Sequence, residues 1–291
     1  MLYHIITILG ISCKKIINNG VTTMNSAPIG VFDSGIGGLT SVKRLLRLLP
    51  HEDVVYLGDT GRVPYGTRSR ETIIKYARQD VQFLQSHGVK TIIIACNTVS
   101  AVAFSELLPE IKIPVFEVVG PPSAQAAALT KNGRVGIIGT AATIKSGAYE
   151  TALRRENPEL FVTVSACPLL VPLVENGRVD PEDIAAQTIV RDYLEPVLQQ
   201  GIDTLILGCT HYPLLRGVIA RIAPDITLVD SGAATADFAA ARLREMELLS
   251  GSTEPGKHSY YVTDAPDSFE SLAGVFLEDD VSGRVFKTTL D

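Results

Sequence analysis

Cys96 stands where the sequence changes abruptly from apolar to polar. The thiol follows the apolar segment 92–95, and Asn97 and Thr98 come directly after it. An amide and a hydroxyl at these positions can orient a polar ligand beside the sulfur. The alternative interpretation of this tripeptide alone is a small, buried core cysteine.

Cys209 has a similar place in the sequence. It follows the apolar segment 204–207 after one glycine, and Thr210 and His211 come next. A histidine two residues from a cysteine can favour the thiolate or hold a proton for the reacting partner. The alternatives are a core histidine or one ligand of a metal. A structural zinc needs four ligands, and the other histidines beyond the N-terminal arm have no ligand spacing, so we predict no metal site.

The two cysteines together indicate a particular chemistry. They are about one domain length apart, and each ends a segment that reads as a buried strand. If the two segments belong to similar lobes, the thiols face each other across one cleft. Racemisation needs this arrangement, because one group removes a proton and the other returns it from the opposite face. A cysteine hydrolase needs one thiol, a base and an oxyanion hole, and has no use for a second opposed thiol.

A glycine-rich loop, residues 33–38 (DSGIGG), precedes an expected helix. Its backbone N–H groups could approach an anion at the start of that helix. The loop lacks the lysine of a P-loop, and its glycine spacing differs from the dinucleotide fingerprint. Asp33 would repel phosphate but could accept an ammonium group or a thiol proton. Helix N-capping by Asp33 or Ser34 is the structural alternative.

Tyr65 and Gly66 lie in a second candidate loop, the segment 63–66 (VPYG). Proline and glycine fix a turn after the expected strand 53–57, and the N–H of Gly66 could meet a carboxylate. As sequence alone, this segment is a turn.

Short apolar segments alternate with helical patterns along the chain. Near-continuous Ile/Val runs of this kind are typical of parallel strands buried on both faces, and the alternation predicts an α/β protein. We expect strands at 29–32, 53–57, 92–95, 115–119, 134–138 and 204–207, and helices at 39–49, 70–87 and 182–200, the last two ended by Gly88 and Gly201.

The order strand, loop, helix recurs in the two halves and indicates an internal duplication. We expect two pseudo-symmetric lobes, each with a mostly parallel sheet flanked by helices, and a site in the cleft beyond the carboxyl ends of the strands. Residues 28–120 with 233–291 form the expected first lobe, because about 60 C-terminal residues would be marginal alone. Residues 121–232 form the second, and 1–27 are an N-terminal extension outside the core.

Composition excludes several classes of protein. The chain has 291 residues, 46% of them apolar and 20% charged, which predicts two ordinary globular domains. A net charge of −6 argues against a nucleic-acid surface. The four cysteines contain no CxxC pair and make no disulfide scaffold. No segment is typical of a membrane span or a signal peptide, so we expect a cytoplasmic protein, with Met24 as its physiological start.

Several segments in the same order resemble the glutamate racemase family of the aspartate/glutamate racemase superfamily. The resemblance runs from about residue 28 to 277, and the extension before it is a departure from the family. The matching segments are 29–38 (IGVFDSGIGG), 57–60 (LGDT), 63–66 (VPYG), 95–98 (ACNT), 139–149 (GTAATIKSGAY), 168–175 (PLLVPLVE), 208–214 (GCTHYPL) and 261–264 (YVTD) with Phe269.

The resemblance implies interconversion of L- and D-glutamate for peptidoglycan synthesis, without pyridoxal phosphate, other cofactor or metal, often in a homodimer. Cys96 and Cys209 would be the catalytic pair. Thr143 matches a ligand-contacting position, and Glu175 a carboxylate near the second thiol. The residues implied to bind the substrate are Asp33, Ser34, Tyr65, Gly66, Asn97, Thr98, Thr210 and His211.

The chemistry demands help for both thiols. Free thiols are poor bases while protonated, so neighbours must generate the thiolate. Asp33 beside Cys96, and His211 or Glu175 beside Cys209, are the expected relays. Two alternatives stay open: another racemase of the superfamily, acting on aspartate or a hydantoin, and a two-lobed amino-acid binder without turnover.

Overall fold

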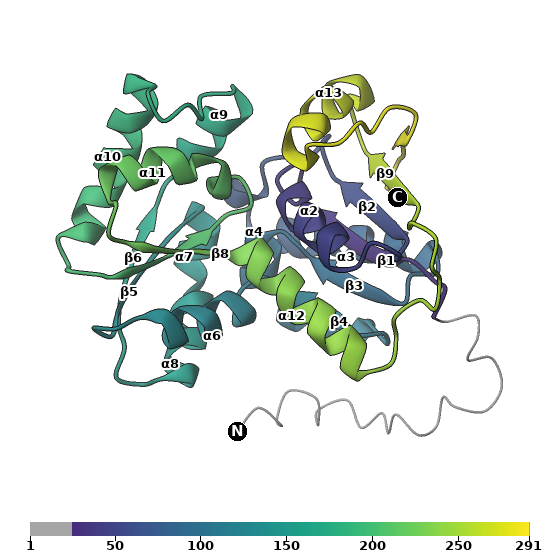
Figure 1. Ribbon diagram of the computed structural model, residues 1–291, viewed down its shortest axis with the longest axis horizontal. Coiled ribbons are helices and arrows are strands. Elements are labelled where there is room, and N and C mark those ends of the chain that lie inside the picture. Colours follow the sequence, from purple (N-terminus) through teal and green to yellow (C-terminus); the bar gives the residue numbers. More distant parts are fainter. Residues whose placement is uncertain (1–24, 291) are drawn as a thin grey trace.

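The computed structural model describes residues 25–290, which form two lobes side by side, each built on a parallel sheet (Figure 1). The first sheet has the strand order β10-β9-β2-β1-β3-β4, and the second has the order β6-β5-β7-β8. Every pairing in both sheets is parallel. The strands are β1 (Ile29–Asp33), β2 (Val54–Gly58), β3 (Thr91–Ile94), β4 (Val115–Glu117), β5 (Arg134–Gly139), β6 (Phe161–Ala166), β7 (Thr204–Gly208), β8 (Thr227–Asp230), β9 (His258–Val262) and β10 (Val285–Lys287).

Helices separate the strands, as the alternation of patterns predicts. The α-helices are α2 (Leu39–Leu48), α3 (Arg70–Ser86), α4 (Asn97–Val102), α5 (Phe104–Leu107), α6 (Gly120–Leu129), α7 (Ala141–Ser146), α8 (Ala148–Glu156), α9 (Leu170–Glu175), α10 (Ile184–Leu198), α11 (Arg216–Ile222), α12 (Ser231–Glu245) and α13 (Pro266–Leu277). The 3₁₀ turns within residues 25–290 are η3 (Tyr65–Thr67), η4 (Leu108–Glu110) and η5 (Tyr212–Leu215).

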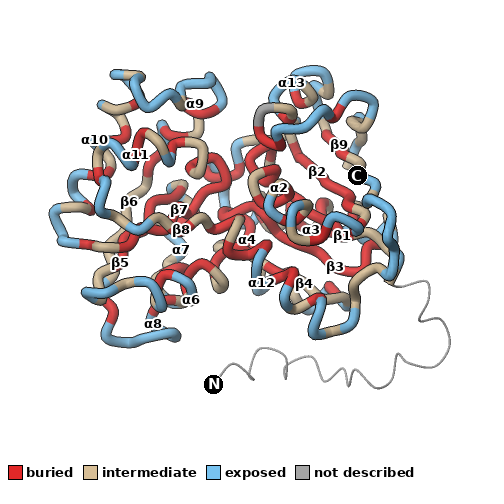
Figure 2. Tube along the Cα trace, viewed as in Figure 1, coloured by how far each residue is buried: buried red, intermediate tan, exposed pale blue. Residues whose placement is uncertain are grey.

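The central strands are the most buried part of each lobe (Figure 2). β1, β2, β3 and β7 are buried along their whole length, because helices cover both faces of a parallel sheet. One apolar cluster continues from the first lobe, through residues such as Leu39 and Tyr56, into the second, through Leu170 and Tyr212. The lobes therefore share part of their core.

The two sheets repeat one topology. The order β2-β1-β3-β4 in the first lobe corresponds to β6-β5-β7-β8 in the second. In this correspondence β3 matches β7, and these are the strands that lead to the two cysteines. The duplication inferred from the sequence is thus visible in the strand order.

Two crossover helices connect the lobes. α6 leads from β4 of the first sheet to β5 of the second, and α12 leads back from β8 to β9. They pack against each other, and α12 also packs on α2 (Figure 1). β9 and β10, which follow α12, extend the first sheet beyond β2.

The predicted ends of the elements are close to those observed, with one informative difference. The strand expected at 115–119 ends at Glu117, because its carboxylate accepts the N–H groups of Val119 and Gly120 and turns the chain into α6. Gly88 and Gly201 follow α3 and α10 with positive φ, as predicted.

The N-terminal extension is described only in part. Asn25, placed in the extension by its sequence, accepts a hydrogen bond from Lys90 Nζ at 2.7 Å and donates one to the carbonyl of Glu247 at 3.2 Å. The apolar run before Lys14 and the proposed start at Met24 lie outside the described residues. No helix within residues 25–290 is long and apolar enough to cross a membrane.

Candidate active site

The two thiols occupy equivalent positions in the two lobes. Cys96 comes two residues after β3 and immediately before α4, and Cys209 comes immediately after β7. Both lie at the carboxyl ends of their strands, where open α/β sheets bind ligands. The side chains are buried, with 4% and 6% of their surface exposed.

Cys96 has a hydroxyl and a carboxylate as polar neighbours. Its thiol donates to Ser34 Oγ at 3.5 Å. Burial, together with the negative charge of Asp33, raises the pKa of Cys96 to about 12. The thiol is therefore protonated at neutral pH unless Asp33 or a ligand changes its environment.

Asp33 ends β1 and organises the glycine-rich loop. Its Oδ2 accepts the N–H groups of Gly35 and Gly38 at 3.2 and 3.1 Å, while Oδ1 is buried without a hydrogen-bond partner among the described residues. The carboxylate does not cap α2 in the usual way, because Gly38 is the residue before that helix. Burial raises the pKa of Asp33, and the nearby His211 opposes the shift. Asp33 is thus suited to accept a proton.

Cys209 faces a histidine. Its sulfur lies 3.9 Å from His211 Nδ1, and His211 Nε2 lies 3.4 Å from Glu175 Oε1 at the end of α9. Burial lowers the pKa of His211, but the Cys209 thiol, the Glu175 carboxylate and the charge of Asp33 outweigh burial and raise this pKa to about 10. A protonated imidazole beside a thiol favours the thiolate.

The glycine-rich loop of the first lobe touches the second lobe directly. A Cβ on Gly37 would lie 2.2 Å from Thr210 Oγ1 and 2.7 Å from His211 Nδ1. Thr40 at the start of α2 also donates weakly to the carbonyl of Thr210, at 3.4 Å. Only a residue without a side chain fits at position 37, so the loop brings Asp33 close to His211 of the second lobe.

A second contact between the lobes involves hydroxyl groups. Thr98 Oγ1 on α4 lies 3.0 Å from Thr140 Oγ1 and 3.5 Å from Thr143 Oγ1, at the start of α7. A Cβ on Gly66 would lie 2.7 Å from the Thr140 Cβ, so η3 packs against the same point. The structure thus brings together Gly66, Thr98 and Thr143, three of the predicted site residues.

The side chain of Tyr65 is directed elsewhere. Its hydroxyl donates to Asp59 Oδ2 and lies 3.2 Å from Asp80 Oδ2, in a buried network that includes Arg62. Burial and the two carboxylates raise the pKa of Tyr65 far above its usual range. The predicted role of Tyr65 in ligand binding therefore has to rest on its backbone, because the phenol is committed to its own lobe.

The amide of Asn97 is also committed to protein partners. Its Nδ2 donates to the Tyr149 hydroxyl at 2.7 Å and to Ser231 Oγ at 3.0 Å, and both N–H bonds are thereby used. The sequence had indicated this amide as a group that orients a ligand.

Three residues of this region were missed by sequence reasoning as site residues: Thr140, Tyr149 and Ser231. Thr140 and Tyr149 lie in segments that carry the family resemblance, but no role was attached to them. Ser231 comes directly after β8 and mirrors the position after β4, so the duplication was the signal that could have found it. Their contacts join distant segments, which one sequence does not reveal.

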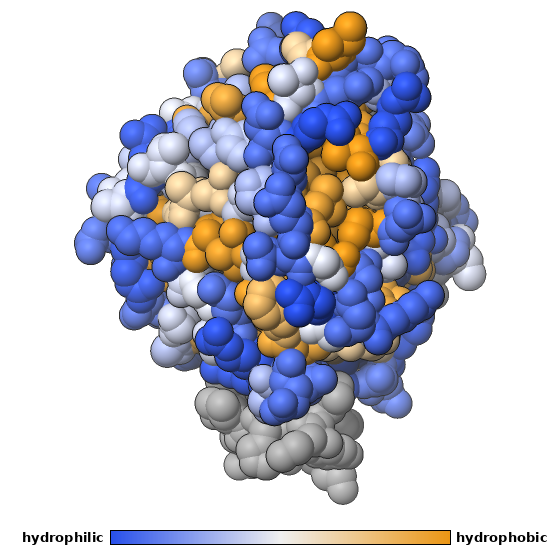
Figure 3. All heavy atoms as spheres, turned by 90° about the vertical axis from the view of Figure 1, so that its left-hand side faces the viewer, coloured by the Kyte–Doolittle hydropathy of each residue, from blue (hydrophilic) through white to orange (hydrophobic). Residues whose placement is uncertain are grey.

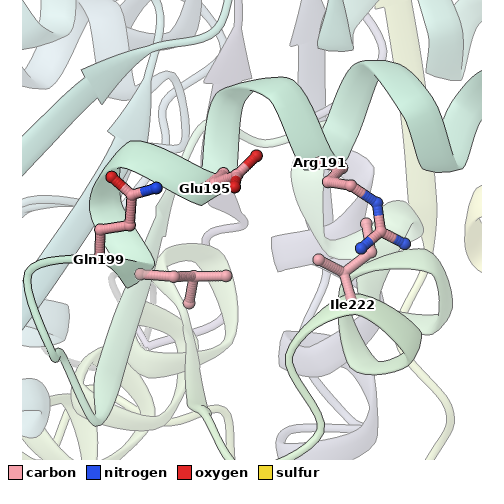
Figure 4. A pocket seen from close by; sticks show the side chains of 5 residues that line it. Arg191, Glu195, Gln199 and Ile222 are labelled. Atoms are coloured by element: carbon pink, nitrogen blue, oxygen red, sulfur yellow. The ribbon is translucent and has the colours of Figure 1, made fainter.

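Two surface cavities lie away from the thiols. One, of about 330 Å³, is lined by Arg191 and Glu195 of α10, by Gln199 directly after that helix, and by Ile222 of α11 (Figure 4). The other, of about 490 Å³, lies beside α9 and α10 and is lined by Leu169, Arg178 and neighbouring side chains. Figure 3 shows the outer face of the second lobe, where apolar side chains flank a polar column. Neither cavity includes a predicted site residue.

Within residues 25–290, no three His, Cys, Asp or Glu side chains are grouped as metal ligands. The site combines the two buried thiols with the buried Asp33 carboxylate, the buried His211 imidazole and the partly exposed Glu175 carboxylate. Groups of these types can hold and transfer protons.

Comparison with known proteins places this site in a family. The model of the Asp/Glu/hydantoin racemase family matches residues 32–239. The glutamate racemase of Geobacter metallireducens is 47% identical over 264 residues, which cover 90% of this chain and 97% of that protein.

Two solved structures have the same fold. Glutamate racemase from Francisella tularensis, in complex with D-glutamate, superposes with a TM-score of 0.85 at 40% identity and covers 92% of this chain and 99% of its own. Glutamate racemase isoform RacE1 from Bacillus anthracis gives a TM-score of 0.86 at 38% identity, with 91% and 98% covered.

The chain therefore belongs to the aspartate/glutamate racemase family, and it is an amino-acid racemase, an isomerase. Within that family its relatives at 38–47% identity are glutamate racemases, as the sequence motifs predict.

Proposed function

We propose that the protein interconverts L- and D-glutamate by proton transfer between two cysteines. The observation that carries the proposal is the pairing of Cys96 and Cys209 at equivalent strand ends, with the Gly37 loop packed directly on Thr210 and His211. Glutamate is the proposed substrate because relatives that cover nearly the whole chain are glutamate racemases.

In the direction from L to D, the Cys209 thiolate removes the α-proton of L-glutamate and becomes a thiol. The Cys96 thiol then protonates the opposite face and becomes a thiolate. His211 stabilises the Cys209 thiolate before the reaction, and Asp33 accepts the proton that Cys96 must lose before the reverse reaction. Burial and fixed dipoles must stabilise the carbanion, and the proposal uses no cofactor or metal.

We propose the substrate contacts residue by residue. Ser34 and Thr98 offer hydroxyls near Cys96, and Thr210 and His211 offer polar groups near Cys209. Tyr65, Gly66 and Asn97 would contribute their backbone. Asp33 would face the ammonium group, whereas Thr143 and Glu175 act as auxiliary groups behind Thr98 and His211.

Supply of D-glutamate for peptidoglycan, in the cytoplasm, is the proposed biological role. Reduced thiols are needed for the reaction, and the three described cysteines are free. The proposed lobes are residues 28–120 with 233–291, and 121–232. We also propose a homodimer; Leu169 and Ile184, exposed at 51% and 79% on the second lobe, are the kind of apolar residues that an interface covers. Light scattering during size-exclusion chromatography tests it, and a monomer at all concentrations would contradict it.

Incubation with L-glutamate in deuterated water tests the function. Polarimetry should show loss of optical rotation, and proton NMR should show deuterium at the α-carbon of the product. Aspartate and a hydantoin serve as competing substrates. Faster turnover of either would assign the chain to another activity of the family, and binding of glutamate without α-exchange would indicate a binder without turnover.

A further inference from the structure

A buried group of hydrogen bonds joins the two catalytic segments. Asn97, directly after Cys96, has two N–H bonds on its side-chain amide. One donates to the Tyr149 hydroxyl at 2.7 Å, and the other to Ser231 Oγ at 3.0 Å. Asn97, Tyr149 and Ser231 are each no more than 2% exposed. We call these three residues the clasp.

The serine of the clasp leads to the second thiol. Ser231 Oγ donates to the carbonyl of Leu207 at 2.9 Å, and Leu207 lies on β7 two residues before Cys209. A short connection therefore runs from Cys96 through Asn97 and Ser231 to the strand that carries Cys209. Ser231 is also the first residue of α12, the helix that returns the chain to the first lobe.

The tyrosine of the clasp leads to the other crossover. Tyr149 belongs to α8 in the second lobe, and its hydroxyl donates to the carbonyl of Val118 at 2.8 Å. Val118 lies between β4 and α6, where the chain leaves the first lobe. The clasp thus contacts both connections between the lobes.

The hydroxyls of the clasp are well paired, and two longer contacts of 3.4 Å join Asn97 Nδ2 to the Val118 carbonyl and Ser231 Oγ to Asn97 Oδ1. Each hydroxyl accepts one N–H from Asn97 and donates its own proton to a backbone carbonyl. Buried polar groups are costly when left unpaired, so each member holds the others in one arrangement.

From this geometry we infer that Tyr149 and Ser231 are positioning residues, which act through Asn97 to fix the separation between the Cys96 and Cys209 thiols. The inference rests on the proposed two-thiol reaction. Neither hydroxyl needs to touch the substrate. They act on the distance between the two thiols, which must both reach the α-carbon of the substrate.

The inference predicts that substitutions in the clasp slow racemisation more than they slow elimination. Racemisation needs both thiols in place, and a misplacement of about 1 Å can cost about 10²-fold in rate. A one-thiol reaction tolerates a change in the separation. Elimination of chloride from 3-chloroglutamate is such a reaction: one thiolate takes the α-proton, the carbon–chlorine bond breaks, and a double bond forms between the α- and β-carbons.

Tyr149→Phe and Ser231→Ala test the inference separately, since each removes one hydroxyl and keeps most of the side-chain volume. We expect kcat/KM for racemisation to fall by about tenfold to 10²-fold in each variant. Elimination from the L- and D-isomers of 3-chloroglutamate should change much less, so the ratio of elimination to racemisation rises.

Thr235→Val is the matched control. Thr235 is fully buried on the same helix, α12, and its hydroxyl donates to the carbonyl of Glu117 at 3.2 Å, not to a side chain of the clasp. We expect the clasp variants and Thr235→Val all to lower the melting temperature. In Thr235→Val, however, the ratio of elimination to racemisation should stay at its wild-type value. This control separates positioning from general destabilisation.

The possible outcomes distinguish the inference about the clasp from the proposed function. A raised ratio in Tyr149→Phe or Ser231→Ala, but not in Thr235→Val, supports the clasp. Rates that fall in proportion, or wild-type racemisation in both clasp variants, would overturn the clasp and leave the proposed function in place. Wild-type protein that does not racemise glutamate would overturn the proposed function and, with it, the clasp.

Discussion

The surroundings of the two thiols differ although the strands that carry them are equivalent. Cys96 lies near a buried carboxylate, and its pKa is raised to about 12. Cys209 lies beside an imidazole whose own pKa is raised to about 10. The duplicated backbone sets where the thiols are, whereas side chains outside the duplicated pattern set which charged groups surround them.

This difference bears on the proposed reaction. In that proposal Cys209, beside His211, acts on L-glutamate, and Cys96, near Asp33, acts on D-glutamate. Burial raises the pKa of Cys96 to about 12 and also raises the pKa of Asp33, so the proposal has Asp33 accept the Cys96 proton. Two equivalent positions would then perform one reversible reaction with unlike neighbours.

The largest expected effect comes from the thiols themselves. Cys96→Ser and Cys209→Ser should each lower racemisation by at least about 10²–10⁴-fold in both directions, because a hydroxyl is far harder to deprotonate than a thiol. Polarimetry with each enantiomer measures this loss. A variant that racemises near the wild-type rate would show that the replaced cysteine is only a core residue. The comparison of two catalytic thiols would then fail.

Substitution of Asp33 and of His211 should affect different isomers of the substrate. Asp33→Asn should slow the elimination of D-3-chloroglutamate by about 10²-fold, and His211→Asn should do the same for the L-isomer. Racemisation itself cannot reveal the side, because enantiomers have equal free energies and kcat/KM must fall equally in both directions. Equal losses for both isomers in each variant would mean that Asp33 and His211 each act on both thiols.

The contact of Gly37 with Thr210 and His211 should matter for activity. In Gly37→Ala the new methyl group would meet Thr210 and His211, so the loop or the second lobe has to shift. We expect kcat/KM to fall about tenfold or more. The matched variant Gly133→Ala, also a glycine but with nothing within 4 Å of the added Cβ, should keep its activity and lose only some stability. Equal activity of the two variants would place the Gly37 contact outside the reaction.

Glu175→Gln should have the smallest effect. Glu175 is 39% exposed, so its interaction with His211 is weakened by solvent, and a pair of this kind contributes about 0.2–1 kcal/mol. Removal of the negative charge lowers the pKa of His211 below its value of about 10. The alkaline limb of the kcat/KM profile, where His211 loses its proton, should therefore move to lower pH. An unchanged limb would show that Glu175 does not act on His211.

Much of the fold was predictable from local pattern. The apolar runs before Cys96 and Cys209 gave two buried strands, and the recurrence of strand, loop and helix gave the two lobes. The positions of both thiols at strand ends follow from those runs alone. Parallel pairing came from the lack of alternation, since strands buried on both faces need no polar side.

The contacts of the site were less predictable, because they depend on which segments meet in space. The amide of Asn97 and the phenol of Tyr65 looked available in the sequence. Ser231, far along the chain, accepts from the amide, and Asp59, in the same lobe, accepts from the phenol. Asp33 lies near Cys96, and His211 contacts both Cys209 and Glu175. Their roles as relays stay a prediction. The duplication was the only sequence signal for Ser231, and its contacts appear once β8 and α12 are placed beside β7.

The most direct measurement is the crossed elimination assay on the two cysteine variants. Each variant keeps one thiol and is offered the L- and D-isomers of 3-chloroglutamate. If the thiols stand on opposite faces, Cys96→Ser still processes the L-isomer through Cys209, and Cys209→Ser still processes the D-isomer through Cys96. Processing of the same isomer by both variants, or of both isomers by one variant, would contradict the assignment of one thiol to each face.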